Sequence, residues 1–166
     1  LPEHGFEGLR WHFIGHLQSN KARLVVGSAA MLHTVDRDSL LAALSARLER
    51  VGHDDAPLEV LVEVNLGAEP SKAGVRPEDA LALCEQVHRD PHVQLRGLMA
   101  VPPASTDPAE ARGWFRQLAR IAHEGRDRGL PLVELSMGMT SDFESAIAEG
   151  ATIIRIGTAI FGHRDR

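Results

Sequence analysis

The sequence predicts an α/β protein whose parallel strands form part of a (β/α)8 TIM-type barrel. Short apolar runs alternate with amphipathic helical segments at regular spacing. Such alternation indicates a parallel sheet with helices outside it. About six strand-then-helix units are expected, which also fits an open doubly wound sheet. We favour a barrel with about six of its eight units, because the sequence starts at Leu1 rather than Met and almost directly enters a strand. A whole barrel needs ~200 residues or more.

The first three strands are expected at residues 11–15, 31–35 and 58–65, where apolar side chains cluster. A loop or helix start follows the first strand at 16–21. A helix over 38–51 follows the second strand, because four leucines lie on one stripe: Leu40, Leu41, Leu44 and Leu48. A polar loop follows the third strand, and Pro77 then opens a helix, since proline favours the first helical position.

The second half of the sequence continues the alternation. A strand is expected at 93–100, where Pro102 and Pro103 end it, and a helix from 108 to about 128. The last two strands are expected around 132–138 and 152–157, with a helix over 144–149 between them. Nothing in the composition suggests a linker or a repeat, so we expect a single domain over residues 1–166.

The strand phase predicts which side chains line the barrel, because alternate residues of a strand share one face. In the third strand, Glu59, Leu61, Glu63 and Asn65 are expected inside. The same count groups His12 with Ile14 and His16, Glu134 with Ser136, and Ile153 with Arg155 and Gly157. An unpaired buried charge is costly. We therefore expect four charged residues to pair with one another or with a ligand: Glu63, Arg96, Glu134 and Arg155.

Two small-residue turns near the C-terminus predict a phosphate-binding site. The first combines Gly138 with Thr140, and the second combines Gly157 with Thr158. Strand-to-helix turns of this kind present backbone N–H groups and the positive end of a helix to one point. In (β/α)8 barrels a phosphate site recurs after strands 7 and 8. Similar turns also occur simply to connect a strand to a helix, so both interpretations stay open on the residues alone.

Composition argues against several other classes of protein. The net charge of −5 and the pI near 6.0 provide no basic field for nucleic acid. No apolar run approaches the ~18 residues that a membrane span needs. Cys84 is the single cysteine, which favours a reducing compartment, so we expect a cytoplasmic protein. His12 and His16 lie four residues apart on one strand, too far apart for a metal pair, and we expect no metal site.

Five motifs point to one family. They are WHFIGHLQSNK at 11–21, EPSKAG at 69–74, GLM at 97–99, LSMGM at 135–139 and RIGTAIFG at 155–162. Over essentially its whole length, the sequence resembles the pyridoxal 5′-phosphate (PLP) homeostasis proteins. These proteins are single-domain barrels similar to the N-terminal domain of alanine racemase.

The resemblance implies a PLP-binding barrel without established catalysis, which carries or buffers the cofactor and so influences amino-acid and vitamin B6 balance. Seven residues match cofactor-binding positions: Asn65, Ser136, Gly138, Thr140, Arg155, Gly157 and Thr158. Ser136, Gly157 and Thr158 would hold the phosphate, and Arg155 would lie against the pyridine nitrogen. A permanent charge there disfavours protonation of that nitrogen, which weakens the ring as an electron sink.

The resemblance also places the Schiff-base lysine upstream of Leu1. Lys21 and Lys72, the only lysines, match other positions of the family, so no covalent PLP residue is assigned within 1–166. Thr140 stands where the family usually has serine and keeps the hydroxyl group. We expect PLP and, through it, PLP-dependent apoenzymes as partners. We also expect a monomer, although the exposed strand edges of an incomplete barrel would favour association.

Two other functions remain open. A PLP enzyme such as a racemase needs a lysine and an opposed acid–base residue; alanine racemases use a tyrosine and a second domain, and this sequence contains no Tyr. A barrel for another phosphorylated metabolite would use Arg155 to contact a carboxylate or phosphate. A hydrolase triad of Ser136, Asp142 and a histidine is not demanded by any spacing, and no catalytic residue is assigned.

Overall fold

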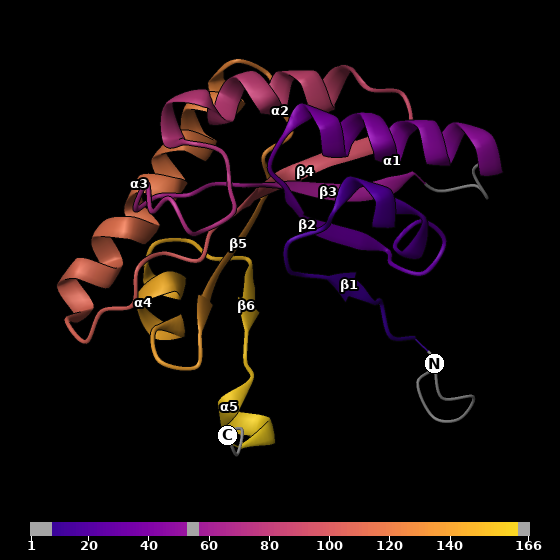
Figure 1. Cartoon of the computed structure of the whole chain (residues 1–166). Coiled ribbons are helices and arrows are strands. Elements are labelled where there is room, and N and C mark those ends of the chain that lie inside the picture. The colour runs from indigo at the N-terminus through magenta and orange to yellow at the C-terminus, as the bar shows by residue number, and fades with distance from the viewer. Residues whose placement is uncertain (1–7, 53–56, 163–166) are drawn as a thin grey trace.

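The structure is a computed structural model that describes residues 8–52 and 57–162. Its strands form one parallel sheet in the order β1-β2-β3-β4-β5-β6, so each strand pairs with its neighbour in the sequence (Figure 1). They are β1 (His12–Phe13), β2 (Met31–Val35), β3 (Leu58–Glu63), β4 (Val93–Met99), β5 (Glu134–Met139) and β6 (Ile153–Arg155). The predicted α/β fold, a barrel with six of its units present, is confirmed.

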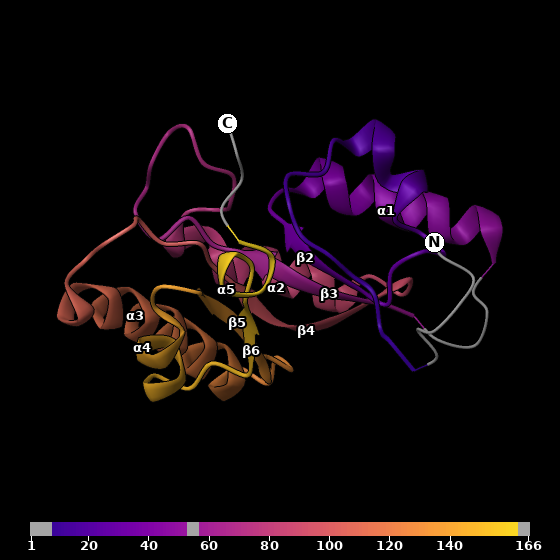
Figure 2. The ribbon, with the colours of Figure 1, turned by 90° about the horizontal axis from the view of Figure 1, so that it is seen from below.

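Helices cover one face of this sheet (Figures 1 and 2). They are α1 (Asp38–Val51), α2 (Ala80–Arg89), α3 (Pro108–Asp127) and α4 (Phe143–Ala148). The short helices η1 (Ser19–Leu24) and η2 (Pro77–Asp79) lie in connections, and α5 (Thr158–Phe161) extends beyond the end of β6 and buries no residue (Figure 1). Leu44 of α1 and Phe115 of α3 are fully buried in the core that these helices share with the sheet. Within the described residues, every helix is too short or too polar to cross a membrane.

The other face of the sheet forms the interior of a partial barrel. A small apolar cluster of Met31, Leu61 and Met99 lies there, whereas Val60 and Val62 belong to the helix-side core, so the predicted phase of β3 is confirmed. Two strands separate β2 from β5 in the sheet. A flat sheet would hold these strands about 14 Å apart. Nevertheless, the Nδ1 atom of His33 lies 2.9 Å from the Oγ atom of Ser136, so the sheet must curve strongly.

The charged residues of the interior lie at two levels. The Nε atom of Arg96 is 3.4 Å from Glu59, and its Nη2 atom is 3.7 Å from Glu134. Glu63 pairs in register with Met99, and Arg155 with Met139, which places both closer to the C-terminal ends of the strands. The expected pairing is confirmed for Arg96 with Glu134. Glu63 and Arg155 lie at the other level and influence each other's pKa, so their pairing with each other or with a ligand stays a prediction.

Element boundaries differ from the prediction mainly at the edges of the sheet. β1 and β6 span only 2 and 3 residues, because among the described residues each pairs with one neighbour only. β5 continues through Gly138, where a break was expected, because glycine accepts the φ of 91° at that position. The helix α1 begins and ends where its leucine stripe predicts.

Candidate cofactor site

The two small-residue turns lie side by side at the C-terminal ends of β5 and β6. These strands are paired neighbours. The backbone N–H of Gly157 donates to the Oγ1 atom of Thr140 over 3.3 Å, which joins the turn after β5 to the turn after β6. Thr158 follows as the first residue of α5. The structure therefore brings three of the predicted residues together.

Gly138 allows α4 to pack closely on the end of β5. A Cβ atom at this position would lie 2.6 Å from the Cβ atom of Ala146 and 3.0 Å from the Cα atom of Phe143. The positive φ is a second reason why only glycine suits the position. Its predicted role in shaping the turn is thus explained by space and by backbone conformation.

Asp142 stands at the N-cap of α4 but does not cap the helix with its side chain. Its Oδ1 atom instead accepts a hydrogen bond of 2.6 Å from the backbone N–H of Met139. At α5, the N-cap residue is Gly157, which has no side-chain acceptor to offer. The first N–H groups of a helix have no partner within the helix. Both turns thus present helix N-termini that their own N-cap side chains leave unbonded.

Arg155 extends from β6 on the interior face, which it shares with Ile153. Its Nη1 atom donates to the carbonyl oxygen of Ser136 at 2.8 Å and to the Oγ atom of Ser136 at 2.7 Å. Its Nη2 atom donates to the carbonyl oxygen of Ala100 at 2.8 Å. Burial lowers the pKa of Arg155, while Asp142 and Glu63 act in the opposite direction. A guanidinium has five N–H groups, so the described residues leave two of them for a ligand.

Ser136 lies beneath the turns, with its hydroxyl group fully buried. Besides Arg155, its Oγ atom contacts the Nδ1 atom of His33, and the Nε2 atom of His33 lies 3.0 Å from the Nδ1 atom of His12. Burial, His12 and Arg155 together lower the pKa of His33 to about 4. In this arrangement His33 is neutral, and the Ser136 hydroxyl faces Arg155 rather than open space.

Glu63 adds a carboxyl group to the same level of the barrel. Its Oε2 atom is buried, and none of the described residues forms a hydrogen bond with it. Burial and the nearby Asp36 raise the pKa of Glu63 to about 7, although Arg155 acts to lower it. Asp36 itself is paired with Arg37 at 2.5 Å and lies 3.7 Å from the Nδ1 atom of His16. His12 and His16 therefore have different partners.

Asn65 is committed to the loop that follows β3. Its Nδ2 atom donates to the carbonyl oxygens of Glu69 at 2.8 Å and Lys72 at 3.3 Å, and its Oδ1 atom accepts from the N–H of Glu69 at 3.2 Å. The structure shows no contact between Asn65 and the two turns. A direct cofactor contact by Asn65 stays a prediction.

Comparison with known proteins decides the family. The model of the alanine racemase N-terminal domain matches residues 1–165. A pyridoxal phosphate homeostasis protein of Aquifex aeolicus is 43% identical over 157 residues, which cover 94% of this chain and 68% of that protein. The chain belongs to the pyridoxal phosphate homeostasis family. The member from Escherichia coli K12 is 42% identical over 166 residues, covering 99% of this chain and 69% of its own length. The chain thus spans about two thirds of these relatives.

Solved structures of the homeostasis family share the fold. PipY of Synechococcus elongatus PCC7942 without PLP has a TM-score of 0.85 and 40% identity, over 95% of this chain and 73% of PipY. The structure of PipY with PLP bound has a TM-score of 0.83 and 37% identity, over 95% of this chain and 72% of PipY. The fold of this chain thus matches that of PipY over 95% of the chain in both structures.

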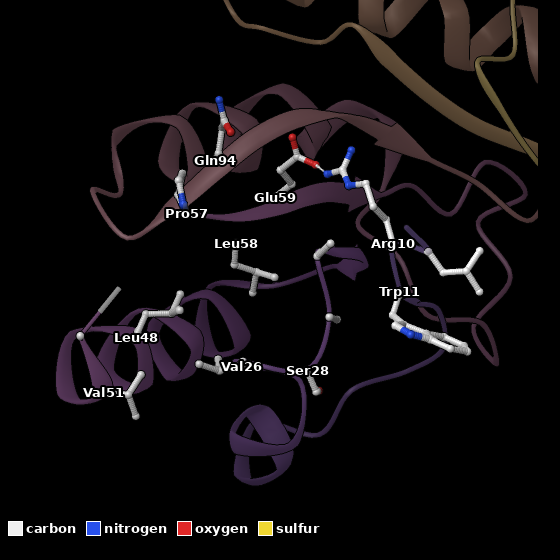
Figure 3. Close-up of a pocket in the computed structure, with 15 residues that line it drawn as sticks. Arg10, Trp11, Val26, Ser28, Leu48, Val51, Pro57, Leu58, Glu59 and Gln94 are labelled. Atoms are coloured by element: carbon white, nitrogen blue, oxygen red, sulfur yellow. Dashed lines mark hydrogen bonds and ion pairs between the residues drawn. The ribbon is translucent and has the colours of Figure 1, made fainter. Parts of the chain in front are cut away.

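A cavity of about 800 Å³ lies at the opposite end of the strands (Figure 3). It is lined by residues near the starts of β1 to β4, among them Trp11, Leu58 and Gln94, and by the C-terminal end of α1 with Leu48 and Val51. Arg10 and Glu59 form an ion pair at its side. The two turns of Gly138, Thr140, Gly157 and Thr158 lie at the C-terminal ends of β5 and β6. This cavity is therefore separate from the site at which the resemblance to the homeostasis family predicts cofactor binding.

Proposed function

We propose that this chain binds PLP without catalysing a reaction of it, and that it acts in intracellular PLP and amino-acid homeostasis. The observation that carries the proposal is the half-buried Arg155, with two N–H groups that have no partner among the described residues, next to the joined turns of Thr140 and Gly157. Its membership of the homeostasis family, and the PLP-bound structure of PipY at 37% identity, support the same ligand.

The residues present fit the two ends of the cofactor. The turns that carry Thr140, Gly157 and Thr158 would hold the phosphate through hydroxyl and backbone N–H groups, with Gly138 shaping the first turn. A spare N–H of Arg155 would donate to the unprotonated pyridine nitrogen. PLP in an enzyme stabilises a carbanion because its protonated ring withdraws electrons. A guanidinium at the pyridine nitrogen keeps that nitrogen unprotonated and so weakens the withdrawal.

We further propose that the chain holds PLP without a covalent bond. Lys21 and Lys72 are its only lysines. The Nζ atom of Lys72 is 2.5 Å from the Oε2 atom of Glu69 and 3.4 Å from the carbonyl oxygen of Pro102. An intact-mass spectrum after borohydride reduction with PLP tests this point. We expect no stoichiometric adduct, and one adduct on either lysine would overturn the non-covalent assignment.

The binding experiment compares PLP with pyridoxal, which lacks the phosphate. In equilibrium dialysis, PLP should bind more tightly than pyridoxal, and Arg155→Met should weaken PLP binding about tenfold or more, as for loss of a charged hydrogen bond. Arg120→Met is the matched control, because the Arg120 side chain is 69% exposed on α3. Equal affinities of the wild type for PLP and pyridoxal, or an Arg155 variant that binds PLP normally, would contradict the proposal.

The remaining parts of the proposal concern the whole protein. A racemase-like function would appear as interconversion of amino-acid enantiomers by the PLP-loaded chain, which we expect to be absent. Delivery of PLP to an apoenzyme would appear as recovery of that enzyme's activity on mixing. The cytoplasmic location and the monomeric state also stay predictions, which fractionation and sedimentation can test.

A further inference from the structure

A continuous series of polar contacts crosses the barrel interior from β6 to β1. It runs from the Nη1 atom of Arg155 to the Oγ atom of Ser136 over 2.7 Å, and on to the Nδ1 atom of His33 over 2.9 Å. The Nε2 atom of His33 then lies 3.0 Å from the Nδ1 atom of His12. We call these four residues the relay. They belong to four strands, two at each side of the sheet.

Donor and acceptor rules favour one direction of the relay, the one in which every polar hydrogen between its members has an acceptor. Arginine can only donate, so the Ser136 oxygen accepts at one end. The hydroxyl hydrogen of Ser136 then has the Nδ1 atom of His33 as its acceptor among the described contacts. His33 must therefore carry its own hydrogen on Nε2 and donate it to the Nδ1 atom of His12. Both histidines are assigned the Nε2–H tautomer by this reasoning, since the contacts restrict each choice.

We propose that His33 is a positioning residue for Arg155: by accepting the Ser136 hydroxyl hydrogen, it turns the lone pairs of Ser136 toward the guanidinium and so fixes the group that would face the PLP ring. The inference deepens the proposed function and rests on it wherever the bound ring is concerned. The relay itself is a property of the ligand-free chain. His33 touches neither turn in the described contacts, so its effect on a ligand passes through Ser136 and Arg155.

The charged groups around the relay keep both histidines neutral near pH 7, and the hydrogen bonds then run from Arg155 through Ser136 and His33 to His12. Arg155 and His12 face His33, and with burial they keep it neutral. Arg10, Glu59 and Glu134 face His12; burial and Arg10 lower its pKa, and the two carboxylates act to raise it. A proton on His12 would convert its Nδ1 atom from acceptor to donor. His33 would then have to donate toward Ser136, which reverses the relay.

Nitrogen-15 NMR of the ligand-free chain tests the relay without any cofactor. At pH 7.5 we expect both His12 and His33 to be neutral Nε2–H tautomers, and Ser136→Ala to shift the Nδ1 resonance of His33 to that of an unbonded acceptor. We also expect Ser136→Ala and His33→Leu to speed up rotation of the Arg155 guanidinium. A charged His33, an Nδ1–H tautomer of His33, or unchanged Arg155 resonances would overturn the proposal.

Three histidine variants then measure the effect on PLP. His33→Leu should bind PLP about five- to tenfold more weakly than wild type, as for one lost hydrogen bond to a charged network. It should also shift the absorbance band of bound PLP in the same direction as Arg155→Met. His33→Asn should stay within about twofold of wild type, because its amide oxygen can replace Nδ1 as the acceptor. His123→Leu is the control, since that side chain is 69% exposed on α3.

The outcomes separate this inference from the proposed function. If the wild type binds no PLP, the proposed function fails, and the NMR measurements still decide whether His33 positions Arg155. If the wild type binds PLP and His33→Asn is as weak as His33→Leu, packing rather than hydrogen bonding explains the loss, and the positioning role is wrong. If His33→Leu does not fold, the tautomers measured by NMR and the PLP affinity of His33→Asn decide whether His33 positions Arg155.

Discussion

The surroundings of Glu63 disfavour the ionised form of its carboxyl group. Its pKa of about 7 lies above the ordinary value of 4.5 because of burial and Asp36. The folded chain thus binds a proton that the unfolded chain has already lost, and stability falls as the pH rises from about 4.5 through 7. Glu63→Gln removes this dependence. We expect the variant to be more stable than wild type by about 1–2 kcal/mol at pH 8, after allowance for partial exposure, and to lose that advantage at pH 5.

Urea unfolding at pH 5, 6, 7 and 8 measures this difference. Glu124→Gln, whose side chain is 51% exposed on α3, serves as the control and should show a constant offset from wild type. A constant offset for Glu63→Gln as well would mean that the Glu63 carboxyl group titrates normally.

The sequence predicts the two small-residue turns after β5 and β6, whose binding role stays a prediction, but it did not single out His33. Alternate residues share a face, so His33 follows Met31 on the inner side of β2. The alternation of β2 thus suffices to place His33 in the barrel interior. The partners of His33 were beyond sequence reasoning, because the contact with Ser136 depends on how strongly the sheet curves.

The strands β4 and β5 are in close contact at Gly97, which pairs with Glu134. A Cβ atom added there would lie 1.8 Å from the carbonyl oxygen of Glu134, and that atom belongs to the backbone of a central strand. Gly97→Ala should therefore force the strands apart and destabilise the chain by about 3 kcal/mol. The free energy of unfolding in urea measures the loss.

Gly113→Ala provides a matched control on α3. A Cβ atom at Gly113 meets nothing within 4 Å, and alanine favours a helix over glycine by about 1 kcal/mol. This variant should be as stable as wild type or more stable. If both substitutions had the same effect, the close approach of β4 and β5 would not limit the choice of residue at 97.

The long amphipathic helices were predictable within a residue or so, because a leucine stripe or a proline at the first turn marks each of them. The edge strands were predicted too long. Apolar residues such as Ile14 and Ile154 are 44% and 37% exposed there, and apolar composition alone does not reveal how many neighbours a strand has. The turns of Thr140 and Gly157 nevertheless follow β5 and β6, as their small residues predict, and their role in holding a cofactor stays a prediction.

On the scale of the whole molecule, the described sheet has two edges that carry apolar side chains. Trp11 and Ile14 lie by β1, and Ile154, Ile160 and Phe161 lie by β6, with exposed fractions from 37% to 85%. Edge strands with apolar surface tend to pair with other chains. We expect a monomer at low concentration and association over the μM–mM range. Sedimentation velocity at increasing concentration measures it.

Ile154→Lys adds a charge to the edge strand β6 and should reduce this association. Ile147→Lys is the control, because Ile147 is 52% exposed on the helix α4 and not on an edge strand. If the Ile154 variant associates as strongly as the control, the edge strand β6 does not mediate the association. The barrel class itself was predictable from the alternation of strands and helices, whereas the state of its edges requires the three-dimensional arrangement.

The relay also has a consequence for the order in which the chain folds. Thr140 and Gly157 are separated by 17 residues, whereas His33 and Ser136 are separated by 103. Closing a longer loop costs more entropy, and contacts distant in sequence tend to form late. The turns can therefore assemble as a local unit while the first two strands are still unattached. Arg155 acquires its final orientation only when β2 arrives, so ligand affinity gained during refolding would report the last step of sheet closure.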